Sequence, residues 1–185
     1  MPSPTRITRL ALLVYAPLTV GALLWAWGSD RRLAWALETP WMGGSYALRL
    51  LVSLGLGLVL AVAVVAMTPV FVERARWARA LHEELAEMIH VLSPSEIMVL
   101  ALSSGIAEEL FFRGAMQPVL GLLLSSAIFG LVHVGPRKVF LAWIAWAFVM
   151  GLLFGLIFEL TGVLWGPVLA HVWINQRNMT YIRRR

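Results

Sequence analysis

Six apolar runs, separated by short polar stretches, constrain the fold of this 185-residue chain more than any other feature. They cover approximately residues 9–27, 45–72, 96–120, 122–134, 138–160 and 162–176. A helix that crosses a bilayer needs about 20 mostly apolar residues, so the first, second, third and fifth runs are long enough to span. The fourth and sixth runs are shorter, and we expect them to lie against other helices.

The composition supports the same interpretation. Apolar residues make up 60% of the chain and charged residues 14%, with a mean hydropathy of +0.80, which leaves too little polar surface for a soluble domain. We predict an all-α, polytopic membrane protein with about six transmembrane or membrane-embedded helices, forming a single domain over 1–185. This excludes a secreted or cytosolic enzyme, and the lack of cysteine excludes thiol chemistry and disulfides.

A polar interval at 73–90 predicts one further helix of a different kind. Its apolar residues Trp77, Leu81, Leu85 and Ile89 recur every four positions between charged residues, which is typical of an amphipathic helix at the membrane interface. A solvated connector is the alternative. The following segment 93–96, Ser-Pro-Ser-Glu, matches a capping box with proline at the first helical position, so the third membrane helix is expected to begin there.

The basic residues predict the orientation in the membrane. If all six segments insert and both termini are cytoplasmic, the cytoplasmic side holds eleven of the fifteen basic residues: Arg6, Arg9, Arg74, Arg76, Arg79, Arg137, Lys138, Arg177, Arg183, Arg184 and Arg185. Arg31, Arg32, Arg49 and Arg113 lie elsewhere. Positive-inside reasoning therefore favours a multi-pass cell-membrane protein with both ends in the cytoplasm. Because the basic residues form short groups between apolar runs, lipid headgroups are a better partner than nucleic acid.

Ionisable residues inside apolar helices are costly and often functional. The third run contains Glu108, Glu109 and Arg113. Glu109 and Arg113 are four residues apart, so they share one helical face and can neutralise each other. Glu108 points about 100° away, which makes it the carboxylate that is free for chemistry.

Two further pairs of residues have helical spacing. Phe129 precedes His133 by four positions, and His171 precedes Asn175 by four positions. Taken alone, His133 also fits a packing or interfacial role. His171 and Asn175 both need hydrogen-bond partners in a dry interior, and their spacing directs them to the same face.

Turns near Gly121 and Gly162 would bring these residues together. With antiparallel helices, Glu108 and His133 lie at similar distances from Gly121, and His171 lies on the order of 15 Å along the last helix, against roughly 18 Å for His133. We therefore expect one buried polar site. Pro118 is expected to kink the third helix.

The three motifs Glu-Glu-x-x-x-Arg, Phe-x-x-x-His and His-x-x-x-Asn occur in this order between 108 and 175. Together they resemble the CPBP family of intramembrane endopeptidases, which includes type II CAAX prenyl endopeptidases and bacteriocin-processing or immunity proteins. The resemblance covers the C-terminal half, with a catalytic core at approximately 93–178, and the first two helices match nothing that we can name.

The resemblance implies specific roles for these residues. Glu108 would act as the general base on a water molecule that His133 helps to hold, while His171 and Asn175 would stabilise the oxyanion. Glu109, Arg113 and Phe129 would support the site. The residue chemistry agrees, because peptide hydrolysis needs an activated nucleophile and preorganised hydrogen-bond donors.

The implied activity is hydrolysis of a peptide bond near the terminus of a lipidated or membrane-anchored substrate, without a metal or cofactor. A zinc site built from one glutamate and two histidines is the chemical alternative, although no His-Glu-x-x-His motif occurs in the sequence. The functional alternatives are a non-enzymatic membrane immunity or assembly factor and a transpeptidase-like enzyme that sorts C-terminally anchored proteins.

Overall fold

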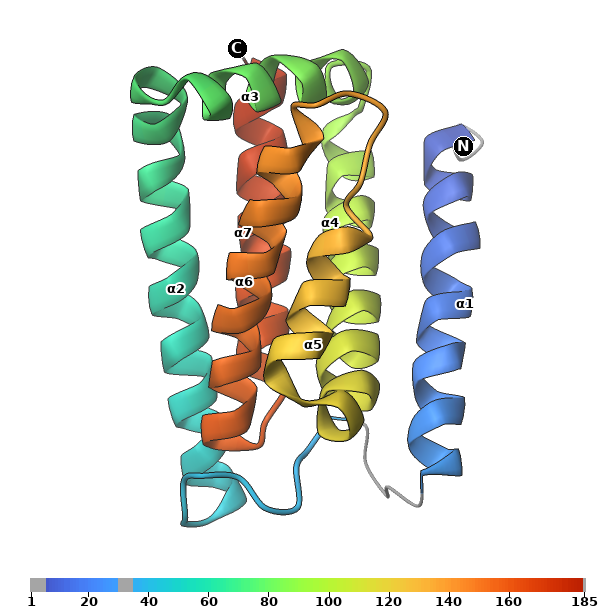
Figure 1. The fold of residues 1–185 in the computed structure, drawn as a ribbon, viewed down its shortest axis with the longest axis vertical. Coiled ribbons are helices and arrows are strands. Elements are labelled where there is room, and N and C mark those ends of the chain that lie inside the picture. The colour runs from blue at the N-terminus through green and yellow to red at the C-terminus, as the bar shows by residue number, and fades with distance from the viewer. Residues whose placement is uncertain (1–5, 30–34, 185) are drawn as a thin grey trace.

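The computed structural model describes residues 6–29 and 35–184, and within them every regular element is a helix. The elements are α1 (Arg6–Gly28), α2 (Tyr46–Arg74), α3 (Arg76–Ile89), α4 (Pro94–Glu108), the π-helix η1 (Glu109–Met116), α5 (Gln117–Leu131), α6 (Phe140–Thr161) and α7 (Trp165–Arg184). Most of them stand upright in a bundle, and α3 lies across its upper end (Figure 1). The predicted all-α class is confirmed.

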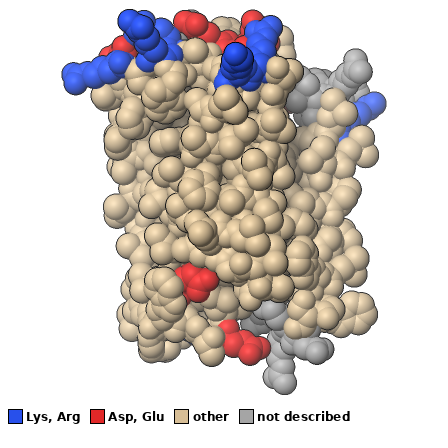
Figure 2. Space-filling view, in the orientation of Figure 1, with Lys and Arg blue, Asp and Glu red and all other residues tan. Residues whose placement is uncertain are grey.

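Four helical segments are long and apolar enough to cross a membrane: Arg9–Gly28, Tyr46–Arg74, Pro94–Leu131 and Phe140–Thr161. They correspond to the long runs of the sequence, with the fourth run continuing from the third. On the face drawn in Figure 2, Lys and Arg gather at the upper end, and the flank below them is mostly uncharged apart from acidic side chains in its lower part. This distribution fits a polytopic protein with its apolar flank in lipid.

The chain enters and leaves the bundle at the same end. The first turn of α1 and the last turn of α7 both lie at the top in Figure 1, together with α3 and the loop before α6. Among the residues used in the charge count, Arg31, Arg32 and Arg185 lie outside the described residues, as does the side chain of Arg6.

The third apolar run forms three pieces instead of one helix. α4 begins with the predicted capping box, in which Ser93 and Glu96 bind each other's backbone N–H groups. It passes into η1 at Glu109, and the backbone N–H of Gln117 donates to Phe112 O, five residues back. The π-helix ends at Met116, two residues before Pro118. The sequence predicts a kink here, because proline disturbs the turn that precedes it. The predicted turn is present at Gly121, whose φ of 80° breaks α5.

The structure corrects the ends of the last runs. The fourth run was expected to continue to 134, but its helix ends at Leu131. The sixth was expected to end at 176, whereas α7 continues to Arg184. The added turns of α7 are polar, yet Met179 and Ile182 pack against Ile89 of α3. Because hydropathy does not record this tertiary contact, the apolar run predicted a helix that was too short.

The apolar stripe of α3 faces protein more than lipid. Leu81 and Ile89 are buried, and Leu85 packs in the same group with the end of α7. Trp77, at the start of the stripe, is 44% exposed and lies near Phe71. The helix is therefore amphipathic as predicted, and its apolar face closes the upper end of the bundle.

α7 is held most closely by α2. A Cβ atom at Gly57 or Gly166 would meet the backbone of the opposite helix, so the two backbones touch. Ser53 of α2 is fully buried, accepts a hydrogen bond from Gly166 N at 3.1 Å and donates to Val163 O at 2.8 Å. This serine satisfies backbone groups at the start of α7.

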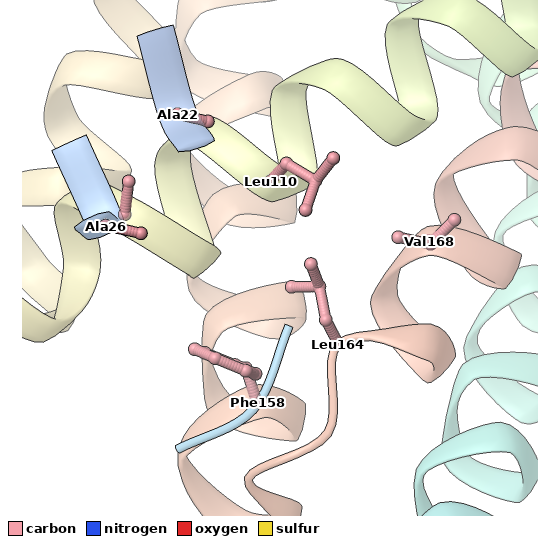
Figure 3. Packing of buried hydrophobic residues seen from close by; sticks show 7 residues of the cluster. Ala22, Ala26, Leu110, Phe158, Leu164 and Val168 are labelled. Carbon is pink, nitrogen blue, oxygen red and sulfur yellow. The ribbon is translucent and has the colours of Figure 1, made fainter. Parts of the chain in front are cut away.

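The lower half of α1 packs against the segment that follows Glu108. Ala22 and Ala26 are buried against Leu110, with Phe158 and Leu164 completing the group (Figure 3). The small alanines allow a close approach of α1. This contact fixes α1 beside the start of η1.

Candidate active site

The two adjacent glutamates occupy the junction between α4 and η1. Glu108 ends α4 and Glu109 begins η1, and both are buried, with exposures of 9% and 0%. Adjacent residues on a helix point in different directions, so the two carboxylates have different partners. Burial of two acidic groups in an apolar bundle requires compensation from neighbouring polar groups.

Glu109 forms the ion pair that its spacing predicts. Arg113 Nη1 donates to Glu109 Oε1 at 3.1 Å, and both side chains are completely or almost completely buried. The guanidinium carbon of Arg113 lies 4.1 Å from the ring centroid of Phe129. Phe129 therefore packs against the cation through a cation–π contact.

His171 of α7 binds the same oxygen of Glu109. Its Nδ1 lies 2.7 Å from Oε1, and because a carboxylate paired with arginine is an acceptor, Nδ1 is the donor. The other ring nitrogen, Nε2, lies 3.8 Å from Glu108 Oε2. Phe154 stacks on the imidazole with 5.2 Å between centroids and an interplanar angle of 18°. The ring is thus fixed in orientation and presents Nε2 to Glu108.

Glu108 keeps one oxygen uncommitted. Its Oε2 accepts no hydrogen bond from the described residues, and the 3.8 Å separation from His171 exceeds a direct hydrogen bond. The carboxylate is therefore buried, with one oxygen that no described side chain binds.

His133 lies two residues after α5 ends, in the loop that leads up to α6. Its Nδ1 lies 2.7 Å from Phe129 O, and since a carbonyl oxygen only accepts, Nδ1 carries the proton. Nε2 is then available as an acceptor. The imidazole packs edge-on against Phe129, with centroids 4.9 Å apart, and Phe129 in turn meets the ring of His171 at 6.1 Å. Phe129 therefore lies between the two histidines.

Asn175 and His171 do not bind a common partner, although their spacing places them on one face. Asn175 Nδ2 donates to Ser104 Oγ at 3.0 Å, one helical turn before Glu108. An amide nitrogen has two N–H groups, so a second donor remains. Ser104 is buried, and it fixes Asn175 beside the glutamate.

The sequence analysis missed Ser104 and Phe154. Ser104 had a usable signal, because it is a polar residue four positions before Glu108 in an apolar helix. Phe154 gave none, since an aromatic residue in an apolar run is the expected composition.

These contacts also bear on metal binding. Within residues 6–29 and 35–184, no three histidine or acidic side chains are grouped as a metal site requires. His171 Nδ1 and Glu109 Oε1 bind each other, and Glu109 Oε1 also binds Arg113. The polar groups therefore fit an arrangement of internal hydrogen bonds better than a set of zinc ligands.

Comparison with known proteins agrees with the motif resemblance. Residues 90–176 match the family described as type II CAAX prenyl endopeptidase Rce1-like. The uncharacterized protein YpbD of Bacillus subtilis (strain 168) is 37% identical over 79 residues, which cover 43% of this chain and 41% of YpbD. The chain thus aligns with less than half of that relative, and no solved structure matches it. The matched segment, residues 90–176, carries all seven residues of the three motifs and is similar to the Rce1-like family of type II CAAX prenyl endopeptidases.

Proposed function

We propose that the chain is an intramembrane endopeptidase that uses Glu108 to activate water. The observation that carries this proposal is the environment of the Glu108 carboxylate, which is buried, faces Nε2 of His171 at 3.8 Å and has an Oε2 atom that accepts no hydrogen bond from the described residues. Glu109, in contrast, is bound through Oε1 by both Arg113 and His171. A buried carboxylate beside a fixed imidazole is suited to general-base catalysis.

In the proposed reaction, Glu108 accepts a proton from water as the oxygen attacks the carbonyl carbon of the scissile peptide bond. His133 Nε2 accepts a second hydrogen bond from this water, which orients it. Collapse of the tetrahedral intermediate breaks the C–N bond, and the proton held by Glu108 passes to the leaving nitrogen. The products are a carboxylic acid and an amine, which ionise to a carboxylate and an ammonium group, so atoms and charge balance.

The oxyanion of the intermediate requires donors. Asn175 has one N–H group left after its bond to Ser104. His171 would donate from Nε2, and its Nδ1 is held at 2.7 Å from Glu109 Oε1 on the other side of the ring. Oriented donors of this kind stabilise developing negative charge at no reorganisation cost. In this proposal, Glu109, Arg113 and Phe129 hold the other site residues in position.

We further propose that the substrate is a lipidated or membrane-anchored protein or peptide, cleaved near its terminus. The apolar flank places the chain in the bilayer, and a buried site can be reached by a substrate that is itself held in the membrane. The gathering of basic side chains at the end of the bundle where α1 begins and α7 ends supports a cytoplasmic position for both ends. Catalysis is assigned to side chains alone, with no metal or cofactor.

The test compares membranes of cells that produce the wild type, Glu108→Gln or Glu83→Gln. Glu83 is an exposed carboxylate of α3 and serves as the matched control. Mass spectrometry of membrane proteins is expected to find new C-terminal peptides with the wild type and Glu83→Gln only. Identical peptide patterns for the wild type and Glu108→Gln would favour an immunity or assembly factor, and a foreign group joined to the new termini would favour a transpeptidase.

The proposal that catalysis needs no metal is tested by elemental analysis and by chelation. Purified protein is expected to contain no stoichiometric zinc by elemental analysis, and a strong chelator is expected to leave cleavage unchanged. Loss of cleavage on chelation, with recovery on adding zinc, would contradict it.

A further inference from the structure

A groove runs between α4 and α7, apart from the candidate active site. It has a volume of about 310 Å³ and is lined by Met98 of α4 and by Leu169, Val172, Trp173, Gln176 and Arg177 of α7. The helical repeat turns this face of α7 well away from the face that carries His171 and Asn175. The groove is therefore separate from the groups that we assign to catalysis.

The two ends of the groove differ in polarity. Four of the six lining residues are apolar, and the two polar ones, Gln176 and Arg177, follow each other on α7. Arg177 lies eight residues after Leu169, which corresponds to about 12 Å along the helix at 1.5 Å per residue. The groove is therefore apolar at the Leu169 end and positively charged at the Arg177 end.

The charged end lies near the membrane surface. α7 rises toward the upper end of the bundle, and α3 lies across that end (Figure 1). Met179, two residues after Arg177, packs in one group with Ile89 of α3. An amphipathic helix in this position marks the level of the lipid headgroups. Arg177 thus lies close to that level, and Leu169 lies deeper, at the level of the acyl chains.

Arg177 has no acidic partner in the part of the chain that the structure describes. Its side chain is exposed, and no ion pair formed within residues 6–29 and 35–184 includes it. The amide of Gln176 donates to Thr180 Oγ1 at 3.3 Å, and its second N–H group can serve another acceptor. A phosphate group provides both the negative charge and the acceptor oxygens that these two side chains bind.

From these observations we propose that the groove binds one anionic phospholipid, with an acyl chain along the apolar part and the phosphate at Arg177 and Gln176. The net charge of +5 favours the same class of lipid. A transmembrane helix is about 10–12 Å wide, so the groove is too small for one, whereas a flexible acyl chain can enter. This site goes beyond the proposed function and does not depend on it.

The test measures lipid binding to the full-length protein in detergent. Native mass spectrometry gives an apparent dissociation constant for the first bound molecule of dioleoylphosphatidylglycerol and of dioleoylphosphatidylcholine. The two lipids have the same acyl chains, so a difference reports the headgroup. The anionic lipid is expected to bind about tenfold more tightly, as one hydrogen bond to a charged group provides. Equal affinities would overturn the proposal.

A first pair of variants tests the charge. Arg177→Gln is expected to weaken binding of phosphatidylglycerol about tenfold and to leave binding of phosphatidylcholine unchanged. Arg76→Gln is the matched control, because Arg76 is an exposed arginine at the start of α3, outside the groove. It is expected to bind both lipids like the wild type. Equal weakening in the two variants would indicate a general attraction to the basic end of the bundle and would overturn the proposal.

A second pair of variants tests the apolar part. Leu169→Trp fills the groove without changing its charge and is expected to weaken binding of phosphatidylglycerol several-fold. Leu153→Trp, at an exposed position of α6 outside the groove, is the control. Wild-type affinity in Leu169→Trp would show that the headgroup binds without a seated chain, which contradicts the proposal. Because no substrate is added, these outcomes stand whether or not the chain proves to be an endopeptidase.

Discussion

Nδ1 of His171 lies 2.7 Å from Oε1 of Glu109, the oxygen that also binds Arg113. This contact joins α7 to the π-helical segment and gives the two glutamates different roles. Glu109 neutralises a buried cation and orients an imidazole, whereas Glu108 has a free oxygen on the other side of the same ring.

The first prediction separates these two carboxylates. Glu109→Gln leaves Arg113 buried without a counter-charge, which costs on the order of 3–5 kcal/mol of unfolding free energy, so thermal stability and activity are expected to fall together. Glu108→Gln is expected to lose activity by about 10²-fold or more with little change in melting temperature. Equal stability of the two variants would contradict this division.

The second prediction concerns the anchor of Asn175. Ser104→Ala removes the hydroxyl that holds Asn175 Nδ2 at 3.0 Å, and we expect cleavage to slow about fivefold, which corresponds to a hydrogen bond of about 1 kcal/mol. Ser103→Ala is the control, because the Ser103 hydroxyl bonds, among the described residues, to carbonyl groups of its own helix alone. In the background of Asn175→Ala, the Ser104 substitution is expected to have no further effect; full additivity would show that the two residues act separately.

The third prediction concerns the contact between α2 and α7. Gly57→Ala places a methyl group against the backbone of Gly166, and overpacking of this kind costs about 1–3 kcal/mol or more. Gly55→Ala, two residues earlier, has open space around the new methyl group and is expected to melt like the wild type. Thermal unfolding in detergent compares the two, and equal melting temperatures would show that the helices can separate at no cost.

The fourth prediction tests the orientation. Single cysteines replace Gly43, in the loop at the lower end, and Lys138, in the loop at the upper end; both sites are exposed, and the chain has no native cysteine. A membrane-impermeant maleimide added outside intact cells is expected to label Gly43→Cys and spare Lys138→Cys until the membrane is permeabilised. The opposite pattern would place the termini outside.

The sequence by itself determined the features that depend on neighbouring residues. The lengths of the apolar runs fix which helices can span, the Ser93–Glu96 capping box starts α4, and Gly121 turns the chain. The ion pair of Glu109 with Arg113 was also predictable, because four residues on a helix determine the geometry. The motif resemblance likewise rests on local spacing.

Only the tertiary structure decided which of these side chains meet. Glu109 and His171 are separated by 62 positions, and Ser104 and Asn175 by 71. Their contacts depend on the rotation and depth of each helix, which close packing at Gly57, Gly166 and Ala22 sets. Hydropathy records which residues are apolar but not which partner a helix faces. For this reason the extension of α7 against α3 could be read only from the folded chain.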